Sequence, residues 1–408
     1  MALHLHGATL VDGTGAEPRA NATLLIEGER ISAVTAQSPA PRNATAIDLS
    51  GCTLLPGLID AHSHVGLVFN FTADPGTMSA AEIAAKTFRN CELCIEAGFT
   101  TIRDMGGIDG GVARVTAAGL INGPRVFPSA APIAQTGGHG HLSGPFCHFD
   151  NLLEVPGLVH PLVVCDGADA VRHAARVNFR RGATQLKAFI SGGVVSQTDR
   201  LEDTQLTIDE LRAAVVEAQS RNTYVSGHAH NCDAIRNGLA AGLACFEHGT
   251  LLDERTADAM ARANAALDPT LAVCHLMAKD WKSWGLDDTI VPRMAGLEAK
   301  MSDAVRMADA ASILMGSGSD LLGPEQNRRG LEIVLKARIL GPLKAIQCAT
   351  LGNAKIMRQD HLLGSIEAGK LADVIAVRGD PVAQPEILDD PTRVVLVVKG
   401  GEIVKNSM

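Results

Sequence analysis

Short apolar runs and longer amphipathic stretches alternate along most of the chain. Between about Gly57 and Arg358, β-prone runs are each followed by a helical pattern rich in Ala, Leu, Glu and Arg. Such alternation is typical of βα units around a parallel sheet. Eight runs qualify as strands: residues 58–65, 100–106, 125–131, 184–191, 223–230, 244–250, 265–271 and 312–320. They predict an α/β fold of the (β/α)8 TIM barrel type.

A doubly wound open sheet is the alternative architecture. That fold is expected to carry a glycine-rich dinucleotide fingerprint after its first strand, and the chain has none there. The barrel is therefore the preferred interpretation. In such barrels the chemistry gathers at the carboxyl ends of the strands, so polar residues at those ends are the first candidates for a functional site.

The two ends of the chain share a different pattern. Residues 5–55 and the stretch from Gly364 onwards consist of short strand candidates separated by turns, as in "ATLLIEGERISAVTA" and "RVVLVVKGGEIV". We predict that residues 1–56 and 359–408 complete one small β-sandwich domain. Residues 57–358 then form the barrel domain.

Composition narrows the choice of partner. The 408 residues carry a formal net charge of −9 and no cluster of Lys and Arg, whereas nucleic acids and anionic membranes require such clusters. We expect a small-molecule substrate, no nucleic-acid or membrane partner, and a homo-oligomer. The N-terminus lacks a signal-peptide pattern. The nine scattered cysteines fit reduced thiols, so a cytoplasmic protein is expected.

Six candidate metal ligands end five of the predicted strands. His62 and His64 are two residues apart, which places both imidazoles on one face of a strand. Alone, this pair fits an exposed strand equally well. His228, His248 and Asp320 close the runs "YVSGHAH", "CFEHG" and "ILMGSGSD". Because neutral imidazole is a favoured ligand for zinc and similar ions, the joint pattern indicates a metal centre.

Lys187, in "TQLKAFISGG", is the sixth candidate ligand. A lysine within an apolar strand is rarely buried without a partner. In one interpretation the side chain extends to the rim and keeps its ammonium group in water. In the other, desolvation and nearby cations lower its pKa, and the neutral amine takes up carbon dioxide as a carbamate. That carbamate would be an anionic, bidentate bridge between two metal ions.

These motifs together resemble the amidohydrolase superfamily of metal-dependent hydrolases. The resemblance covers essentially the whole chain and is carried by "LPGLIDAHSH", the strand lysine, "GHAH" with "FEHGTLLD", "GSGSD" and "LLGSIEAGKLADVIAV". Within the superfamily, "AQTGGHGHLSG" and "EHGTLLDE" resemble the branch of dipeptidases that cleave Xaa-Pro or Xaa-Arg/Lys substrates and of relatives that act on ochratoxin-like amides. Imidazolonepropionases are more distant.

The resemblance implies a role for each residue. Two divalent metal ions are expected, with zinc as the first choice. His62, His64 and Asp320 would hold one ion, His228 and His248 the other, and carbamylated Lys187 would bridge them. His139 would lie near the substrate carbonyl, and His230 would line the substrate pocket. His230 stands where some prolidase-like relatives carry Tyr, which leaves the leaving-group preference open.

The implied activity is hydrolysis of a C–N amide bond in a small peptide-like substrate. The substrate would be a dipeptide such as Xaa-Pro or Xaa-Arg/Lys, or an N-acyl amino acid. Paired metal ions lower the pKa of a bound water, so a hydroxide nucleophile exists near neutral pH. Asp320 would take a proton from that water and pass it to the leaving nitrogen. His139 would stabilise the oxyanion.

Other functions stay open at this stage. Hydrolysis of xenobiotic amides, ureas or carbamates would use the same metal centre with a different pocket. Cyclic-amide hydrolysis of the imidazolonepropionase kind and deamination come next, although Lys187 counts against a single-metal deaminase. A non-catalytic scaffold would have lost ligands that this chain retains. Cys147 and His148 have no convincing triad partner, which disfavours a cysteine nucleophile.

Overall fold

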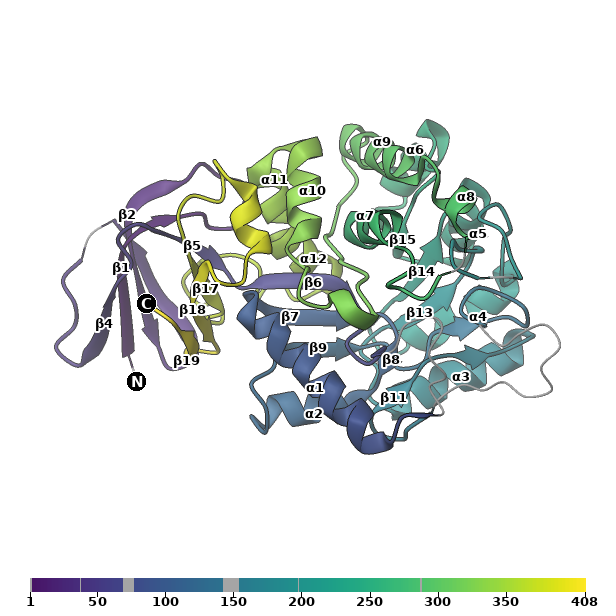
Figure 1. The fold of residues 1–408 in the computed structure, drawn as a ribbon, viewed down its shortest axis with the longest axis horizontal. Helices are drawn as coiled ribbons and strands as arrows, with labels where there is room; N and C mark the ends of the chain where they lie inside the picture. The colour runs from purple at the N-terminus through teal and green to yellow at the C-terminus, as the bar shows by residue number, and fades with distance from the viewer. Residues whose placement is uncertain (1, 37, 69–76, 142–153, 197, 287) are drawn as a thin grey trace.

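Strands from both chain ends form one sheet at one end of the molecule, beside the βα units (Figure 1). The computed structural model describes residues 2–36, 38–68, 77–141, 154–196, 198–286 and 288–408. The terminal sheet contains β1 (Ala2–Leu10), β2 (Arg19–Glu27), β3 (Arg30–Thr35), β4 (Ala44–Asp48), β5 (Cys52–Pro56), β17 (Val374–Arg378), β18 (Val394–Lys399) and β19 (Glu402–Asn406).

The strand order in this sheet is β19-β18-β17-β5-β1-β2-β3, and β4 pairs with β1. The two chain ends meet where β5 and β17 pair antiparallel, with Leu55 opposite Ile375. One edge of β1 pairs first with β4 and then with β5. Between the two pairings lies Gly7, whose φ of +83° is a conformation that favours glycine. Hydrogen bonds thus join the strands into one branched sheet rather than the two separate sheets of a sandwich.

The inner strands are parallel and fall into two groups. One sheet has the order β6-β7-β9 and the other β12-β10-β13-β14-β15-β16. Their bounds are β6 (Leu58–Ser63), β7 (Phe99–Asp104), β9 (Arg125–Pro128), β10 (Ile133–Ala134), β12 (Val163–Val164), β13 (Leu186–Phe189), β14 (Val225–Ala229), β15 (Cys245–His248) and β16 (Ala266–Asp268); β8 (Gly107–Ile108) pairs with β11 (Val159–His160). Seven of the eight predicted strands are therefore present.

The eighth predicted strand, residues 312–320, is not a regular strand. It makes one isolated bridge, from Met315 to Leu267. The reason lies in its backbone N–H groups, because Ser317 donates to the Asn353 side chain (2.8 Å) and Ser319 to the Asp60 side chain (2.9 Å) instead of to a neighbouring strand.

Backbone hydrogen bonds nevertheless bridge the two parallel sheets. Ala61 N–H donates to the Ser317 carbonyl (3.2 Å), and Gly316 N–H donates to the Leu267 carbonyl (2.8 Å). On the other side, Thr184 N–H donates to the Pro128 carbonyl (2.8 Å). The parallel βα arrangement is as expected, while the sheets themselves stop at three and six strands. Closure into a continuous barrel, and the domain boundaries, stay predictions.

Helices follow the parallel strands in sequence and cover them. They are α1 (Ala80–Glu96), α2 (Gly110–Ala117), α3 (Ala168–Arg180), α4 (Ile208–Gln219), α5 (Cys232–Ala241), α6 (Glu254–Arg262), α7 (Leu271–Lys279), α8 (Val291–Met294), α9 (Leu297–Ala310), α10 (Leu331–Leu340), α11 (Pro342–Gln347) and α12 (Asn353–Ile356), with short 3-10 turns at Gly323–Glu325 and Pro385–Asp389 and a π-helical turn at Cys348–Gly352. Capping boxes start α1, at Ser79 with Glu82, and α4, at Thr207 with Glu210. No helix in the described ranges has the length and apolar character needed to cross a membrane.

The buried ion pair between Asp60 and Arg329 ties β6 to the segment at residues 317–320. Asp60 accepts hydrogen bonds from the backbone N–H groups of His62 (3.1 Å) and Ser319 (2.9 Å). The Arg329 guanidinium donates to Asp60 and to Ser63 Oγ, and neither charged side chain is more than 1% exposed. Two segments that are distant in sequence are thereby fixed beside each other.

Replacing Arg329 by Met should destabilise the protein strongly. The substitution leaves the Asp60 carboxylate buried without its partner, which typically costs about 3–5 kcal/mol. Urea unfolding measures the loss. Arg306→Met is the control, because the exposed Arg306 pairs only with exposed Asp303 and such pairs contribute little. Equal losses in the two variants would contradict this role for the buried pair.

Candidate metal centre

The predicted site residues come together at the carboxyl ends of the parallel strands. We call His62, His64, His139, His228, His230 and His248 the histidine cluster. Ring centroids lie 5.1 Å apart for His62 and His64, 5.1 Å for His62 and His248, 4.4 Å for His228 and His248, 4.6 Å for His228 and His230, and 4.3 Å for His139 and His228. Imidazoles from four separate segments thus share one small volume.

Asp320 lies in the cluster beside His62, which is on β6, and His64, which follows β6. Its Oδ1 atom lies 3.1 Å from His64 Nε2 and 3.5 Å from His62 Nε2, and its Oδ2 atom lies 3.8 Å from His248 Nδ1. Donor atoms of His62, His248 and Asp320 all lie within 4.8 Å of one another, so His248 of the second expected ligand group stands next to the first group.

Hydrogen bonds from Nδ1 orient the imidazoles. They run from His62 to Glu247 Oε2 (2.7 Å), from His64 to the Gly106 carbonyl (2.9 Å) and from His248 to Thr270 Oγ1 (2.7 Å). A carboxylate and a carbonyl only accept, so Nδ1 of His62 and of His64 carries a proton, and Nε2 of both rings faces the Asp320 carboxylate. Metal-binding histidines are typically held in this way by an outer partner.

Among the predicted metal ligands, Lys187 Nζ, His228 Nε2 and His248 Nε2 are buried and have no hydrogen-bond partner within the described part of the chain. Lys187 is 1% exposed, on β13. A buried polar atom without a partner is costly and is expected to serve some purpose. Divalent metal ions would satisfy the two imidazole nitrogens, and a carbamate would remove the isolated ammonium group. The residues present therefore fit a metal centre.

Burial sets most of the pKa values in the cluster. It lowers the pKa of His228 and His248 well below the usual range, and lowers that of Lys187 to about 8. For His64, burial acts in the same direction, but the hydrogen bond and charge of Asp320 outweigh it and the pKa is raised. Burial thus favours neutral imidazoles at His228 and His248 and a partly neutral amine at Lys187, the protonation states that metal binding and carbamylation require. Asp320, in contrast, favours the charged form of His64.

Two residues of the site have left-handed backbone conformations. His248 has a φ of +68° and Asp320 a φ of +55°. Non-glycine residues rarely adopt such values, and they concentrate at functional sites. At His248 the consequence is visible, because the consecutive residues Glu247 and His248 both reach His62. Strict strand alternation would have sent them to opposite faces.

A buried charge network supports the cluster from below, and the sequence did not reveal it. Arg103 donates to Glu247 Oε1 (2.8 Å) and to Asp268 Oδ2 (3.0 Å), and all three side chains are fully buried. Burial raises the pKa of Glu247, but Arg103 and His62 outweigh this effect and lower it. Glu247 therefore stays ionised and holds His62. The sequence signal for this network was Arg103, a charged residue inside the β-prone run "TTIRDMG".

His139 is held by a relay of hydrogen bonds. Its Nδ1 lies 2.9 Å from Ser196 Oγ, and the Ser196 hydroxyl donates to Asp199. Because that proton is committed to Asp199, Ser196 Oγ accepts from Nδ1–H, and Nε2 of a neutral His139 carries the lone pair. Gly193 lies beneath the ring, and a Cβ there would approach within 2.2 Å of it. This relay makes Nε2 an acceptor, in contrast to the expected donor to an oxyanion.

Other candidates lie in scaffold positions or outside the described part of the chain. Asp104 accepts hydrogen bonds from the backbone N–H groups of Val65 and Gly106, both at 3.1 Å, and burial raises its pKa to about 7. It therefore organises the turn that follows β6 and β7. Cys147 and His148 lie outside the described residues.

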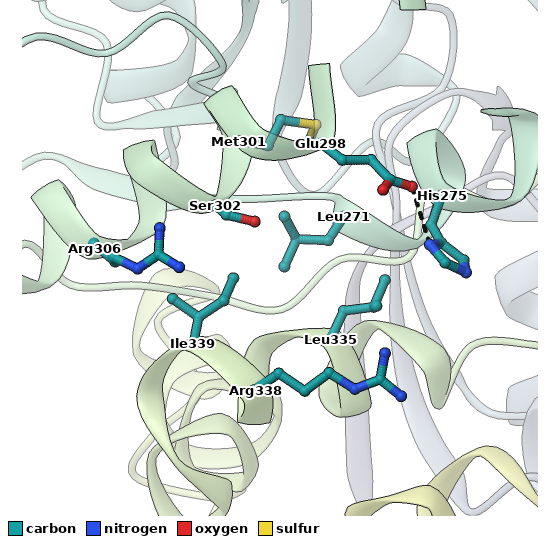
Figure 2. Close-up of a pocket in the computed structure, with 9 residues that line it drawn as sticks. All are labelled: Leu271, His275, Glu298, Met301, Ser302, Arg306, Leu335, Arg338 and Ile339. Atoms are coloured by element: carbon teal, nitrogen blue, oxygen red, sulfur yellow. Dashed lines mark ion pairs between the residues drawn. The ribbon is translucent and has the colours of Figure 1, made fainter. Parts of the chain in front are cut away.

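A separate pocket lies between α7, α9 and α10 (Figure 2). Its lining includes Leu271, Leu335 and an ion pair between His275 and Glu298 (3.0 Å). It contains none of the predicted site residues. Its lining residue Leu271 follows Thr270 in the chain, and the Thr270 hydroxyl is hydrogen-bonded to His248.

Replacing Thr270 by Val should weaken metal binding without unfolding the protein. Valine keeps the shape but removes the hydroxyl bonded to His248, and loss of an outer partner typically lowers metal affinity about 10–100-fold. Competition with a chelator measures this affinity. Thr116→Val is the control, because its hydroxyl bonds only within α2, to the Ala113 carbonyl. Unchanged zinc affinity in Thr270→Val would exclude the anchoring role.

Comparison with known proteins agrees with this geometry. The model of the amidohydrolase family matches residues 53–404. Ochratoxinase from Aspergillus niger is 30% identical over 98% of this chain and 86% of that protein. A prolidase solved in complex with N-methylphosphonate-L-proline is 34% identical, with a TM-score of 0.93 and 100% of both chains covered. A Xaa-Pro dipeptidase with bound methionine in its active site is 29% identical, with a TM-score of 0.88 and 99% of both chains covered.

The expected superfamily resemblance is thereby confirmed. The family match extends over the whole parallel βα region and on through the C-terminal strands as far as residue 404. The relatives are hydrolases by name, and the whole chain is similar to them. This protein belongs to the amidohydrolase family.

Proposed function

We propose that this protein hydrolyses the C–N amide bond of a small peptide-like substrate, with Xaa-Pro and related dipeptides as the first candidates. The observation that carries the proposal is the histidine cluster with Asp320 in it, where His228 Nε2 and His248 Nε2 are buried without a hydrogen-bond partner. The prolidase and the Xaa-Pro dipeptidase support the substrate class because they are similar over essentially the whole chain.

The cluster would hold two divalent ions, with zinc as the first choice. His62, His64 and Asp320 would bind one ion, His228 and His248 the other, and carbamylated Lys187 would bridge them. When bound, such ions lower the pKa of water and polarise a carbonyl group. The parallel strands would act as one closed barrel that fixes these ligands, with the terminal sheet as a separate domain.

Lys187 is suited to carbamylation. Burial lowers its pKa to about 8, so about a tenth of the amine is neutral at pH 7, far more than for an ordinary lysine. The amine lone pair would attack carbon dioxide, an N–C bond would form, and one proton would leave to solvent. The product is a carbamate anion in a position where a buried ammonium group has no partner.

Asp320 would manage the proton during hydrolysis. Burial raises the pKa of this carboxyl, but His62 and His64 outweigh the effect and lower it, so the group is an available base. It would accept a proton from the attacking water and pass it to the departing nitrogen, which leaves slowly unless it is protonated. His139, with its Nε2 lone pair, would accept a hydrogen bond from an N–H group of the substrate.

Hydrolysis of a xenobiotic amide is the second candidate. It is favoured by the 30% identity to ochratoxinase over 98% of this chain. The metal centre and the proton transfers would be the same, and only the shape of the pocket would differ. Ureas and carbamates would follow as weaker candidates of this class.

A substrate screen on zinc-loaded protein separates these alternatives. We expect the highest kcat/KM for Xaa-Pro, Xaa-Arg or Xaa-Lys dipeptides or N-acyl amino acids, with lower values for ochratoxin A and for phenylureas. Product formation is measured from the amine that hydrolysis releases. Hydrolysis of ochratoxin A or of a phenylurea without any dipeptide cleavage would replace the proposal by the second candidate.

Replacing Lys187 by Ala should remove most bound metal and most activity. The substitution deletes the proposed bridge, and short carboxylates such as acetate or propionate should restore part of both by occupying the space. Metal analysis and turnover are measured together. Lys86→Ala, on the exposed face of α1, is the control. Unchanged turnover in Lys187→Ala would refute the bridging role.

A further inference from the structure

Phe189 lies on the same face of β13 as Lys187. The two residues are two positions apart in the strand, so their side chains point to the same side of the sheet. Lys187 Nζ lies 5.8 Å from the centroid of the Phe189 ring. Lys187 is buried, whereas Phe189, nearer the carboxyl end of the strand, is partly exposed. The phenyl ring therefore lies nearer to solvent than the lysine.

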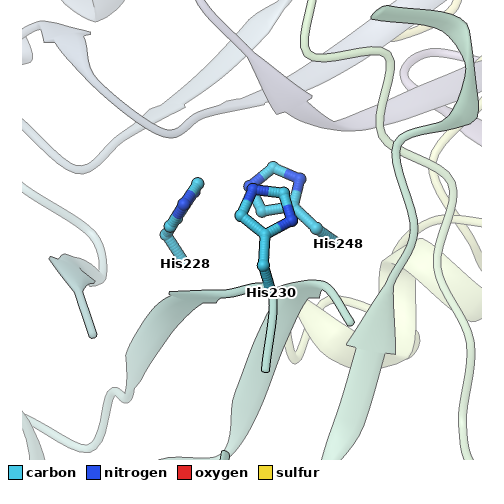
Figure 3. A group of neighbouring side chains, drawn as sticks. All are labelled: His228, His230 and His248. Atoms are coloured by element: carbon cyan, nitrogen blue, oxygen red, sulfur yellow. The ribbon is translucent and has the colours of Figure 1, made fainter. Parts of the chain in front are cut away.

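The Phe189 ring meets the histidine cluster edge to face. Its centroid lies 5.0 Å from that of His139, with an interplanar angle of 84°, and 5.3 Å from that of His228, with an angle of 70°. His228 in turn stands beside His230 and His248 (Figure 3). The phenyl ring is thus placed directly against one expected metal ligand and against His139.

Gly140 lets the backbone approach this ring closely. A Cβ atom at Gly140 would lie 2.8 Å from Phe189 Cε2 and 3.1 Å from Leu162 Cδ1. The φ of +84° at Gly140 also favours glycine. The loop after β10 therefore packs tightly on the ring. A side chain held in this way is a fixed apolar surface, so a ligand placed on it adds little cost for ordering that side chain.

The cluster is not equally buried on all sides. His139, Asp320 and Phe189 are partly exposed, whereas the side chains around them are buried, namely His62, His64, Lys187, His228, His230 and His248. Within the described part of the chain, a ligand that comes from solvent to the expected metal ligands meets the three exposed side chains first. Two of these side chains are polar, and Phe189 supplies the apolar surface.

From this arrangement we infer that Phe189 is a specificity-determining residue, an apolar wall beside the metal centre that selects substrates with an apolar group next to the scissile bond. The inference rests on the metal centre of the proposed function and names the substrate class of that same site. A proline ring or a branched apolar side chain would cover the phenyl ring and remove apolar surface from water. An Arg or Lys side chain at this wall would bring a positive charge close to the divalent ions, which would repel it. Xaa-Pro dipeptides therefore rank above Xaa-Arg and Xaa-Lys dipeptides.

The test replaces Phe189 by Leu and by Asn in the full-length, zinc-loaded protein. Leucine and asparagine are similar in size and shape and differ in polarity. The probes are acetohydroxamate and benzohydroxamate, which both bind zinc through the hydroxamate group, while only the second carries a phenyl group. Calorimetric titration measures both affinities, and their ratio is compared between variants. Phe179→Asn is the control, because Phe179 lies on α3 with its ring centroid 4.9 Å from the Arg221 guanidinium.

We expect the native protein to prefer benzohydroxamate, and Phe189→Asn to lose about tenfold of this preference, roughly the gain from covering a phenyl group with an apolar wall. Phe189→Leu should stay within about threefold of the native preference, because its side chain is also apolar. Phe179→Asn should leave the preference unchanged. Equal affinities for the two probes in the native protein would overturn the assignment, and so would an equal loss of preference in Phe189→Leu and Phe189→Asn.

These outcomes are separable from failure of the proposed function. If no amide is cleaved but Phe189→Asn still loses the preference for benzohydroxamate, the apolar wall stands and the substrate proposal fails. If dipeptides are cleaved but Phe189→Asn keeps both this preference and the native ratio of kcat/KM for Ala-Pro to that for Ala-Lys, the substrate proposal stands. In that case the assignment to Phe189 fails.

Discussion

Buried nitrogen atoms without hydrogen bonds are the feature on which the candidate metal centre depends. Lys187 Nζ, His228 Nε2 and His248 Nε2 lie inside the protein with no partner among the described residues. Folding normally pairs such groups, because desolvating a polar atom without compensation costs about 1–3 kcal/mol. Together with His62, His64 and Asp320 in the same cluster, these atoms indicate that a cation belongs there. The rest of the structure keeps these atoms in place.

That support comes from layers of hydrogen bonds beneath the imidazoles. Glu247 holds His62, and Arg103 holds Glu247. Asp60 and Arg329 connect β6 to the segment that ends in Asp320. Because these hydrogen-bonded side chains are fully buried, a substitution of any one of them would shift the positions of the metal-binding side chains. The same principle applies at His139, where Ser196 and Asp199 select the nitrogen that carries the proton.

Much of this organisation could be predicted from the sequence, because strand periodicity and the polar residues at strand ends are local signals. Seven strands, the βα order and the gathering of the site residues follow from them. The eighth segment is not a regular strand because the side chains of Asn353 and Asp60 take the backbone N–H groups of Ser317 and Ser319. These contacts join distant parts of the chain. The role of Glu247 could not be predicted because the left-handed conformation of His248 breaks the alternation of side chains along the strand. The hydrogen bonds of Ser196 could not be predicted because they depend on the path of a loop.

The most direct test of the central claim is a crystal structure of the metal-loaded protein with anomalous diffraction measured at the zinc edge. The account predicts two anomalous peaks in the histidine cluster, one beside His62, His64 and Asp320 and one beside His228 and His248, with density extending beyond Lys187 Nζ. Absence of peaks in the cluster from protein crystallised with excess zinc, or peaks only elsewhere, would contradict it.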